Sequence, residues 1–148
     1  MKHFLFDMDG TLTEHRKEIS QKMSRMVADL LEIGKVCIIS GSKFDDICHQ
    51  CGPLWAQPKF INLKNLKLMP CNGTQLYEWD GNDWKLIKIA DMQSEFGDDK
   101  FQLLLRQIML AQLMIVCNDD YLADFKISYD FIDYRRSLIN WCPIGRSS

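Results

Sequence analysis

The chain has 148 residues, of which 47% are hydrophobic and 26% charged, and its net charge is −2. This length by itself fits one domain with a sizeable core, and the charge balance gives no reason to expect nucleic acid as a partner. No apolar run approaches the roughly 20 residues of a membrane span. Because Asp7 and Asp9 stand where a secretion signal needs an apolar core, we expect a cytoplasmic protein without a membrane partner.

The first expected element is a strand at residues 4–6, an apolar run suited to burial on both faces. It leads into Asp7 and Asp9, and Gly10 allows a sharp turn where the strand ends. In an open α/β sheet, ligands bind at this carboxyl edge. Two carboxylates so close repel each other, and a divalent cation is the usual remedy. The alternative, a plain strand end with an Asp-Gly turn, does not explain the carboxylates and following hydroxyls together.

A helix is expected next, because apolar residues recur three and four apart as far as Gly34, where a helix would end. The residues expected to bury its apolar face are Ile19, Met23, Met26, Val27, Leu30 and Leu31. A second buried strand at 35–39 completes a strand–helix–strand unit, which predicts a parallel sheet with a right-handed crossover. This strand ends in Ser40-Gly41-Ser42, whose hydroxyls can bind a phosphate or cap a helix.

The rest of the chain alternates between short predicted elements. In order, we expect a helix at 47–52, a proline-containing loop at 53–58, strands at 60–63 and 66–69, a hairpin of 75–79 with 84–87, a helix at 101–113 and a strand at 130–135. Cys48 and Cys51 form a lone Cys-x-x-Cys. A zinc site needs a second pair of ligands, so we interpret all six cysteines as reduced thiols, with a redox or metal site as the weaker alternative. Asn72-Gly73-Thr74 also matches a glycosylation acceptor, which a cytoplasmic protein would not use.

Three stretches resemble one known family. Asp-x-Asp-Gly-Thr-Leu-Thr at 7–13 resembles the first motif of the haloacid-dehalogenase (HAD) superfamily of phosphatases and phosphomutases. Residues 72–74 and the following hairpin resemble the HAD branch whose cap is inserted after this point. The run at 143–147, Pro-Ile-Gly-Arg-Ser, is similar to the cap of the eukaryotic-type phosphomannomutases. The resemblance implies an α/β fold, with a Rossmann-like HAD core of parallel strands at 1–80 and a partial α+β cap at 81–148.

The resemblance also implies roles for particular residues. Asp7 would be the nucleophile that takes a phosphoryl group, Asp9 the general acid/base, and both would bind Mg²⁺. The residues implied to bind substrate or its phosphate are Thr11, Arg16, Ser40, Gly41, Ser42, Arg135 and Arg146. Either Ser40 or Ser42 would supply the phosphate-binding hydroxyl, and the last two arginines would hold the phosphate that does not react. Each arginine alone is as well explained by a solvent-facing charge, which is our interpretation of Arg136.

The implied activity is a magnesium-dependent, phosphomannomutase-like transfer on a hexose phosphate. A HAD phosphatase acting on a small phosphoester, or a non-catalytic phosphosugar-binding remnant, are the alternatives, and the resemblance leaves room for a homodimer through the cap. In the family, a lysine and further metal-binding aspartates follow the cap, but none follows Ser148. We expect either an incomplete coding sequence or a short form with the Asp7 strand at an open edge. Asp120 and Asp124 have the spacing of the missing acidic motif, although 121–124 also matches the end of a cap helix.

Overall fold

The computed structural model describes residues 1–56, 62–117 and 126–146. The chain divides into two compact units, Met1–Ile89 and Ala90–Ser148. Residues 60 and 61 of the strand expected at 60–63, the alternative acidic motif at Asp120 and Asp124, and the end of the 143–147 run lie outside the described residues. The strand prediction is wrong at Leu63, which begins a 3₁₀ turn.

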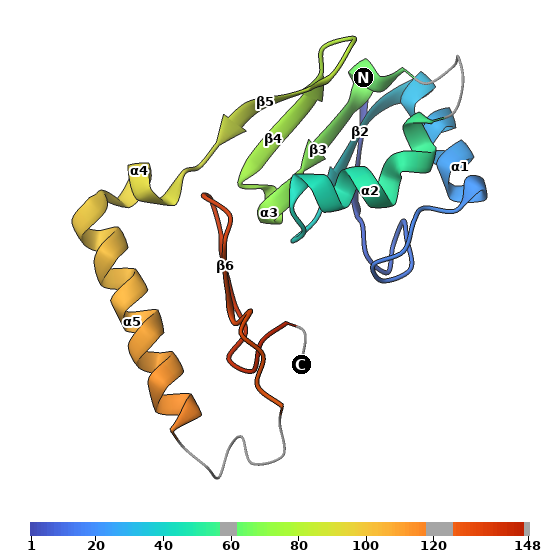
Figure 1. The fold of residues 1–148 in the computed structure, drawn as a ribbon. Coiled ribbons are helices and arrows are strands. Elements are labelled where there is room, and N and C mark those ends of the chain that lie inside the picture. The colour runs from blue at the N-terminus through green and yellow to red at the C-terminus, as the bar shows by residue number, and fades with distance from the viewer. Residues whose placement is uncertain (57–61, 118–125, 147–148) are drawn as a thin grey trace. The chain divides into compact units, whose positions relative to one another are not determined.

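The first unit is built on a five-stranded sheet (Figure 1). Its strands, in both spatial and chain order, are β1 (Lys2–Asp7), β2 (Gly34–Ile39), β3 (Leu66–Met69), β4 (Gln75–Trp79) and β5 (Trp84–Ile89). The first three are parallel, and β4 and β5 are antiparallel to their neighbours. This arrangement confirms the predicted α/β fold with a parallel sheet. It also places β1 at the edge of the sheet in the described part of the chain.

Two helices connect the parallel strands. α1 (Gln21–Ile33) begins after Ser20, whose Oγ accepts a hydrogen bond of 3.2 Å from the Met23 N–H. α2 (Phe44–Trp55) runs through Pro53, so the loop predicted at 53–58 is wrong for its first three residues. The helix persists because Leu54 is fully buried and the Ala56 N–H donates to the Gly52 carbonyl at 2.9 Å. A 3₁₀ turn (Leu63–Asn65) and α3 (Pro70–Gly73) flank β3.

The core of this unit lies on one face of the sheet. Buried residues of α1, α2, β2 and β3 form it with residues of the loop between β1 and α1: Met8, Leu12, Ile19, Val27, Leu31, Val36, Ile38, Ile47, Cys51, Leu54, Leu66 and Leu68. Phe4 and Phe6 pack against this cluster, whereas Leu5 points to the opposite face and is 65% exposed. The prediction that β1 is buried on both faces is therefore wrong. Met26 was also expected in the core and is 52% exposed.

The second unit contains two helices and a hairpin. They are α4 (Met92–Phe96), α5 (Asp98–Val116), β6 (Ile132–Tyr134) and β7 (Ile139–Trp141), with β6 and β7 antiparallel. Gln112 of α5 is bonded to the hairpin segment, because its Nε2 donates to the Pro143 carbonyl at 2.9 Å and its Oε1 accepts from Trp141 Nε1 at 2.8 Å. The expected cap range, 81–148, includes β5, which pairs with β4 in the sheet of the first unit. The division into a core at 1–80 and a cap at 81–148 stays a prediction.

The longest described helix, α5, exposes a row of large apolar side chains. They are Leu103, Met109, Leu110, Leu113 and Met114. None of the described helices is both long and apolar enough to cross a membrane.

Candidate functional site

The candidate site begins where the three parallel strands end. Asp7 of β1 lies opposite Ile39 of β2, and Ile39 lies opposite Met69 of β3. Neighbouring strands are about 4.8 Å apart, so the loops that follow these residues emerge side by side. As the sequence predicts, Asp7 and Asp9 share this edge with Ser40 and Ser42.

A tight turn after β1 fixes the backbone between the two carboxylates. The carbonyl of Met8 accepts hydrogen bonds from the N–H groups of Leu12 and Thr13, at 2.9 and 3.0 Å, and from Thr13 Oγ1 at 3.2 Å. Gly10 has a φ of +80°, which a residue with a side chain adopts only with strain. Thr11 is exposed at the tip of this turn, and its N–H donates to the same carbonyl at 3.3 Å.

The two aspartates have different surroundings. Oδ1 of Asp9 accepts from the backbone N–H of Arg16 at 2.9 Å and from Nε2 of Gln50 at 3.1 Å, and its side chain is 23% exposed. Asp7 is an exposed residue at the end of β1. Two neutral donors therefore hold Asp9 Oδ1, and His15 Nδ1 lies 4.0 Å from the same oxygen. Asp7, by contrast, is exposed, so a substrate can approach it.

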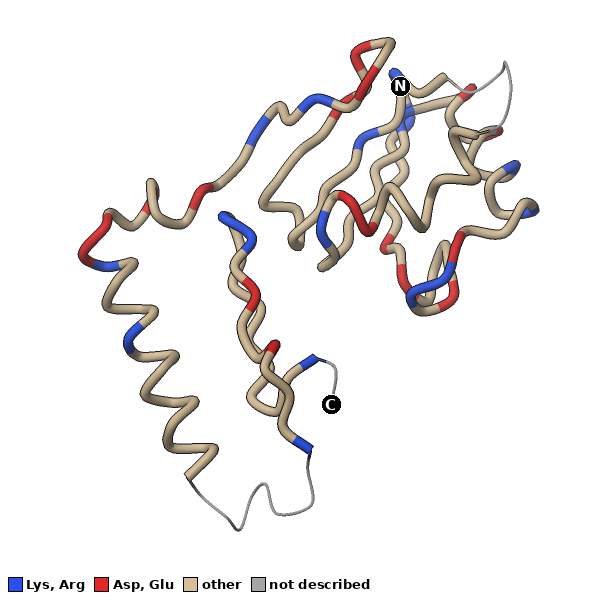
Figure 2. The backbone as a smooth tube through the Cα atoms, in the orientation of Figure 1, with Lys and Arg blue, Asp and Glu red and all other residues tan. Residues whose placement is uncertain are grey.

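Arg16 approaches Asp9 through its backbone rather than its guanidinium. Its φ of +56° turns the N–H toward the carboxylate, a conformation that is uncommon for a residue other than glycine. The loop between β1 and α1 carries charges of both signs (Figure 2), among them Glu14, Lys17 and Glu18. The structure thus brings Arg16 to the site, with its side chain exposed.

The hydroxyl loop after β2 is held by backbone bonds to the β3 side. The Ser40 N–H donates to the Met69 carbonyl at 3.2 Å, and the Ser42 carbonyl accepts from the Cys71 N–H at 3.0 Å. Ser40 is buried, and its Oγ accepts from the Ser42 N–H at 3.1 Å. Neither serine caps α2, because the residue before this helix is Lys43.

The third loop at this edge has an unusual backbone. Cys71, Asn72 and Gly73 have φ values of +53°, +58° and +81°, so three consecutive residues are left-handed. The Asn72 N–H donates to the Ser40 carbonyl at 2.8 Å, and its Oδ1 lies 3.1 Å from where a Cβ on Gly41 would stand. Side-chain-bearing residues in this conformation are strained and concentrate at functional sites. A larger residue at position 41 would therefore require the Asn72 side chain to move by a few tenths of an ångström.

The two predicted cap arginines lie together in the second unit. Oδ2 of Asp133 accepts from Arg135 Nε at 2.9 Å and from Arg146 Nη1 at 2.8 Å. Arg136 also forms an ion pair, in which its Nη2 lies 2.9 Å from Asp91 Oδ2.

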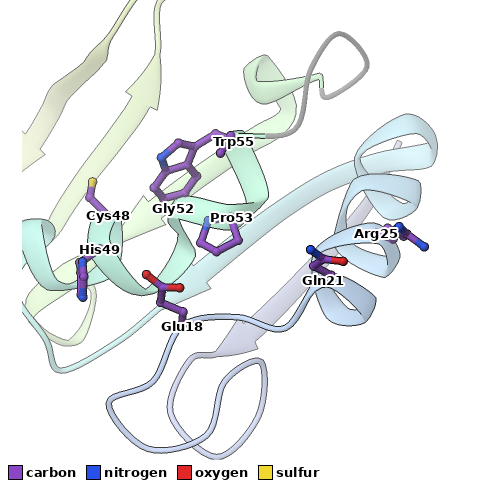
Figure 3. Close-up of a pocket in the computed structure, with 9 residues that line it drawn as sticks. Glu18, Gln21, Arg25, Cys48, His49, Gly52, Pro53 and Trp55 are labelled. Carbon is purple, nitrogen blue, oxygen red and sulfur yellow. The ribbon is translucent and has the colours of Figure 1, made fainter.

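A pocket of about 860 Å³ lies on the helical side of the first unit (Figure 3). The loop before α1, α1 itself and α2 line it with Glu18, Gln21, Arg25, Cys48, His49, Gly52, Pro53, Trp55 and Ala56. None of the predicted site residues lines this pocket, so it is separate from the sheet edge that carries Asp7.

The Cys-x-x-Cys pair lies on α2. Burial, the largest cause, raises the pKa of both Cys48 and Cys51 to about 12, and nearby carboxylates act in the same direction. Redox and metal chemistry use the thiolate, and burial disfavours this form at both cysteines. Among the described residues, no group of three or more His, Cys, Asp or Glu side chains could hold a metal ion.

Sequence comparison finds phosphomannomutases among the relatives of this chain. The chain is 28% identical over 146 residues to phosphomannomutase 2 of Dictyostelium discoideum, covering 97% of this chain and 51% of that protein. It is 30% identical to the phosphomannomutase of Encephalitozoon cuniculi, covering 97% of this chain and 50% of that one. The chain is a relative of phosphomannomutases. It spans about half the length of the relatives it matches, and no family model matches it.

Solved structures confirm the fold of this phosphomannomutase relative. The IMP-nucleotidase of Plasmodium falciparum superimposes with a TM-score of 0.66 at 15% identity, over 94% of this chain and 38% of that one. A haloacid dehalogenase-like hydrolase from Bacteroides thetaiotaomicron superimposes with a TM-score of 0.51 at 20% identity, over 75% of this chain and 38% of that one. The predicted HAD fold is confirmed, and so is the resemblance to phosphomannomutases.

Two residues that hold predicted site residues, Asp133 and Gln50, were missed from the sequence. Asp133 is separated by one residue from Arg135, a spacing that places both side chains on one face of a strand, so the pair was detectable. Gln50 has no such pattern, because its contact with Asp9 joins residues that are 41 positions apart.

Proposed function

We propose that this chain carries the N-terminal catalytic residues of a phosphomannomutase-like phosphotransferase acting on a hexose phosphate. The observation that carries this proposal is the unequal pair at the end of β1, an exposed Asp7 beside an Asp9 held by Gln50 and the Arg16 N–H. A nucleophile must reach the substrate phosphorus, and an acid/base must keep a fixed position against the sugar oxygen. The sequence similarity to phosphomannomutases supports the sugar phosphate as substrate.

In the proposed reaction, a carboxylate oxygen of Asp7 forms a bond to the phosphorus while the bond from phosphorus to the sugar oxygen breaks. Asp9 gives its proton to the departing sugar oxygen. In the second half, Asp9 takes the proton of an attacking sugar hydroxyl, which forms the new P–O bond and releases Asp7. The half-buried Ser42 is better placed than Ser40 to bind the phosphate, because the Ser40 hydroxyl is buried and accepts the Ser42 N–H.

Asp7 and Asp9 would also hold Mg²⁺. Magnesium is bound by one or two carboxylates together with water and substrate phosphate oxygens, and both bonds that fix Asp9 fall on its Oδ1. Two adjacent carboxylates thus fit this ion without a larger acidic cluster. When bound, Mg²⁺ would reduce the repulsion between the carboxylates and a phosphate dianion.

The test is to incubate the chain with mannose 1-phosphate, a catalytic amount of hexose 1,6-bisphosphate and Mg²⁺, and to follow isomerisation and phosphate release together by ³¹P NMR. Isomerisation supports a mutase, and release of inorganic phosphate alone supports the phosphatase. Asp7→Asn is expected to abolish either activity, since it removes the nucleophile. Activity that survives this substitution, or its absence in the unsubstituted chain, would overturn the proposal.

A further inference from the structure

Strand β1 presents a free edge. Among the described strands, only β2 pairs with it, in one unbroken register from Lys2 opposite Gly34 to Asp7 opposite Ile39. The backbone N–H and C=O groups on the other side of such a strand are unpaired and can bond to a strand of another chain. Proteins commonly block an edge of this kind with a proline or a bulge. β1 contains neither, so nothing in its own backbone prevents pairing.

The side chains that β1 exposes from His3 onward lie on one face. His3, Leu5 and Asp7 are exposed. Phe4 and Phe6 are half-buried and pack against the core. Alternate residues of a strand point to opposite faces, so the three exposed side chains form one row on the face opposite the helices. The row consists of a base, an apolar side chain and an acid, and its centre, Leu5, is 65% exposed.

This row is complementary to itself. In antiparallel pairing of two copies, directly opposed residues point to the same face, with Cβ atoms about 4.5–5.5 Å apart. A two-fold axis at Leu5 opposes the two Leu5 side chains and places His3 of each copy opposite Asp7 of the other. An imidazole N–H can donate to a carboxylate whether or not the ring is charged. On the helix side, the same register opposes Phe4 to Phe6.

The neighbouring registers lack this match. Because the side chains keep their faces only when a strand moves by two residues, the nearest alternatives place the axis at Phe4 or at Phe6. The first opposes His3 to Leu5, and the second opposes Leu5 to Asp7. In both, a polar side chain lies opposite leucine, and within the strand no acid faces a base. Of the three registers, only the one centred on Leu5 matches every pair.

We propose that β1 is a homodimer interface, at which two copies of this chain pair edge to edge and antiparallel, with the two-fold axis at Leu5. Such an interface is isologous, so each copy uses the same strand. The sheets of the two first units then continue as one. Association also adds a side chain to the candidate site, because His3 of one copy stands beside Asp7 of the other. The proposal goes beyond phosphoryl transfer, since it holds with or without that activity.

The experiment is sedimentation-velocity centrifugation of the full chain over a wide range of concentration, with a thermal melt of each variant. A monomer–dimer equilibrium is expected. Leu5→Lys should weaken dimerisation at least about tenfold, because it replaces the central apolar contact with two opposed like charges. Met114→Lys is the matched control, since it makes the same kind of change at a side chain of α5 that is 75% exposed, and it should leave the dissociation constant unchanged.

An exchange of charges tests the register. His3→Asp should weaken dimerisation about tenfold, because it opposes an acid to Asp7 at both ends of the strand pair. Asp7→Lys should act in the same direction, since it replaces the acceptor opposite His3 with a second base. The double variant, His3→Asp with Asp7→Lys, opposes an acid to a base again and should recover most of the loss. Losses that add up in the double variant would overturn the register.

The remaining outcomes bear on the interface itself. A chain that stays monomeric at every soluble concentration would refute it. A dimer that Met114→Lys dissociates and Leu5→Lys does not would be joined through α5 instead. If Leu5→Lys does not fold, Leu5→Cys replaces it, because the axis brings the two substituted positions together and peptide mapping after oxidation should find a disulfide between them. Linkage only through other cysteines, such as the exposed Cys117, would contradict the pairing.

Discussion

Gln50→Leu tests whether a buried amide fixes the proposed acid/base. Gln50 is 5% exposed, and its Nε2 donates to Asp9 Oδ1 at 3.1 Å and to the Lys17 carbonyl at 3.3 Å. A hydrogen bond to a charged group contributes about 1.5–3 kcal/mol, and a long neutral one about 0.5 kcal/mol. The added apolar surface of leucine offsets about 1 kcal/mol. We expect the free energy of unfolding to fall by about 2 kcal/mol.

The assay is urea unfolding followed by tryptophan fluorescence. Trp55, Trp79 and Trp84 lie in the first unit, so this signal mainly reports the part of the chain that contains Gln50. For a unit of this size, a loss of 2 kcal/mol lowers the melting temperature by about 10 °C. The variant should also expose the Arg16 N–H to faster hydrogen exchange, because Asp9 loses one of the two donors that fix it.

Gln112→Leu is the matched control, since it too removes a buried glutamine with two side-chain hydrogen bonds, but in the second unit. It should destabilise the chain while leaving hydrogen exchange at Arg16 unchanged. A loss below about 0.5 kcal/mol for Gln50→Leu, with unaltered exchange at Arg16, would refute the reasoning. The hydrogen bond from Gln50 would then make no contribution to the position of Asp9.

Three further outcomes follow from burial and charge. Because pKa values of about 12 leave few thiolates, Cys48 and Cys51 should react with iodoacetamide at pH 8 roughly a thousandfold more slowly than an unperturbed thiol. Mass spectrometry can follow the labelling, with the exposed Cys117 as internal reference. Equal labelling of the three cysteines would contradict this expectation. Leu5→Lys, at an edge strand that is prone to pairing with other chains, should raise solubility with little change in melting temperature, as measured by light scattering and thermal melts. The Ser94 N–H and Arg136 lower the pKa of Asp91, so the stability that Asp91 contributes is present above the ordinary aspartate pKa and is lost as the pH falls through the lowered one. Asp91→Asn should therefore reduce the fall in the urea midpoint at acidic pH. An unchanged fall would contradict the assignment.

The parallel sheet and its crossovers were predictable because they depend on local periodicity. Apolar spacing over α1 and an uninterrupted apolar run in β2 identify each element without knowledge of its neighbours. The burial of β1 was not predictable in this way. Leu5 has the same character as Phe4 and Phe6, but only the latter two face the helices, so which side is covered depends on tertiary packing.

The end of α2 illustrates a second limit. Proline lacks an N–H and usually marks a break in a helix, yet Pro53 lies inside α2. The turn persists because Leu54 is buried in the core and the backbone bond from Ala56 to Gly52 continues the helix. Tertiary packing thus overrides the local preference, which sequence alone cannot weigh.

The candidate site shows the same division between local and distant information. The Asp7 and Asp9 spacing, the Ser40–Ser42 loop and their common sheet edge follow from the motif and the strand order. Which serine is buried and which residue fixes Asp9 depend on contacts between segments far apart in the chain. Residues that support a site are therefore harder to predict than the residues that carry its chemistry.

The choice of glutamine beside Asp9 fits the proposed chemistry in a way that a cation would not. An acid/base must be protonated in one half of the reaction and ionised in the other. A side-chain amide has both a donor and an acceptor, so after rotation Gln50 can also accept a hydrogen bond from a protonated Asp9, whereas lysine or arginine can only donate.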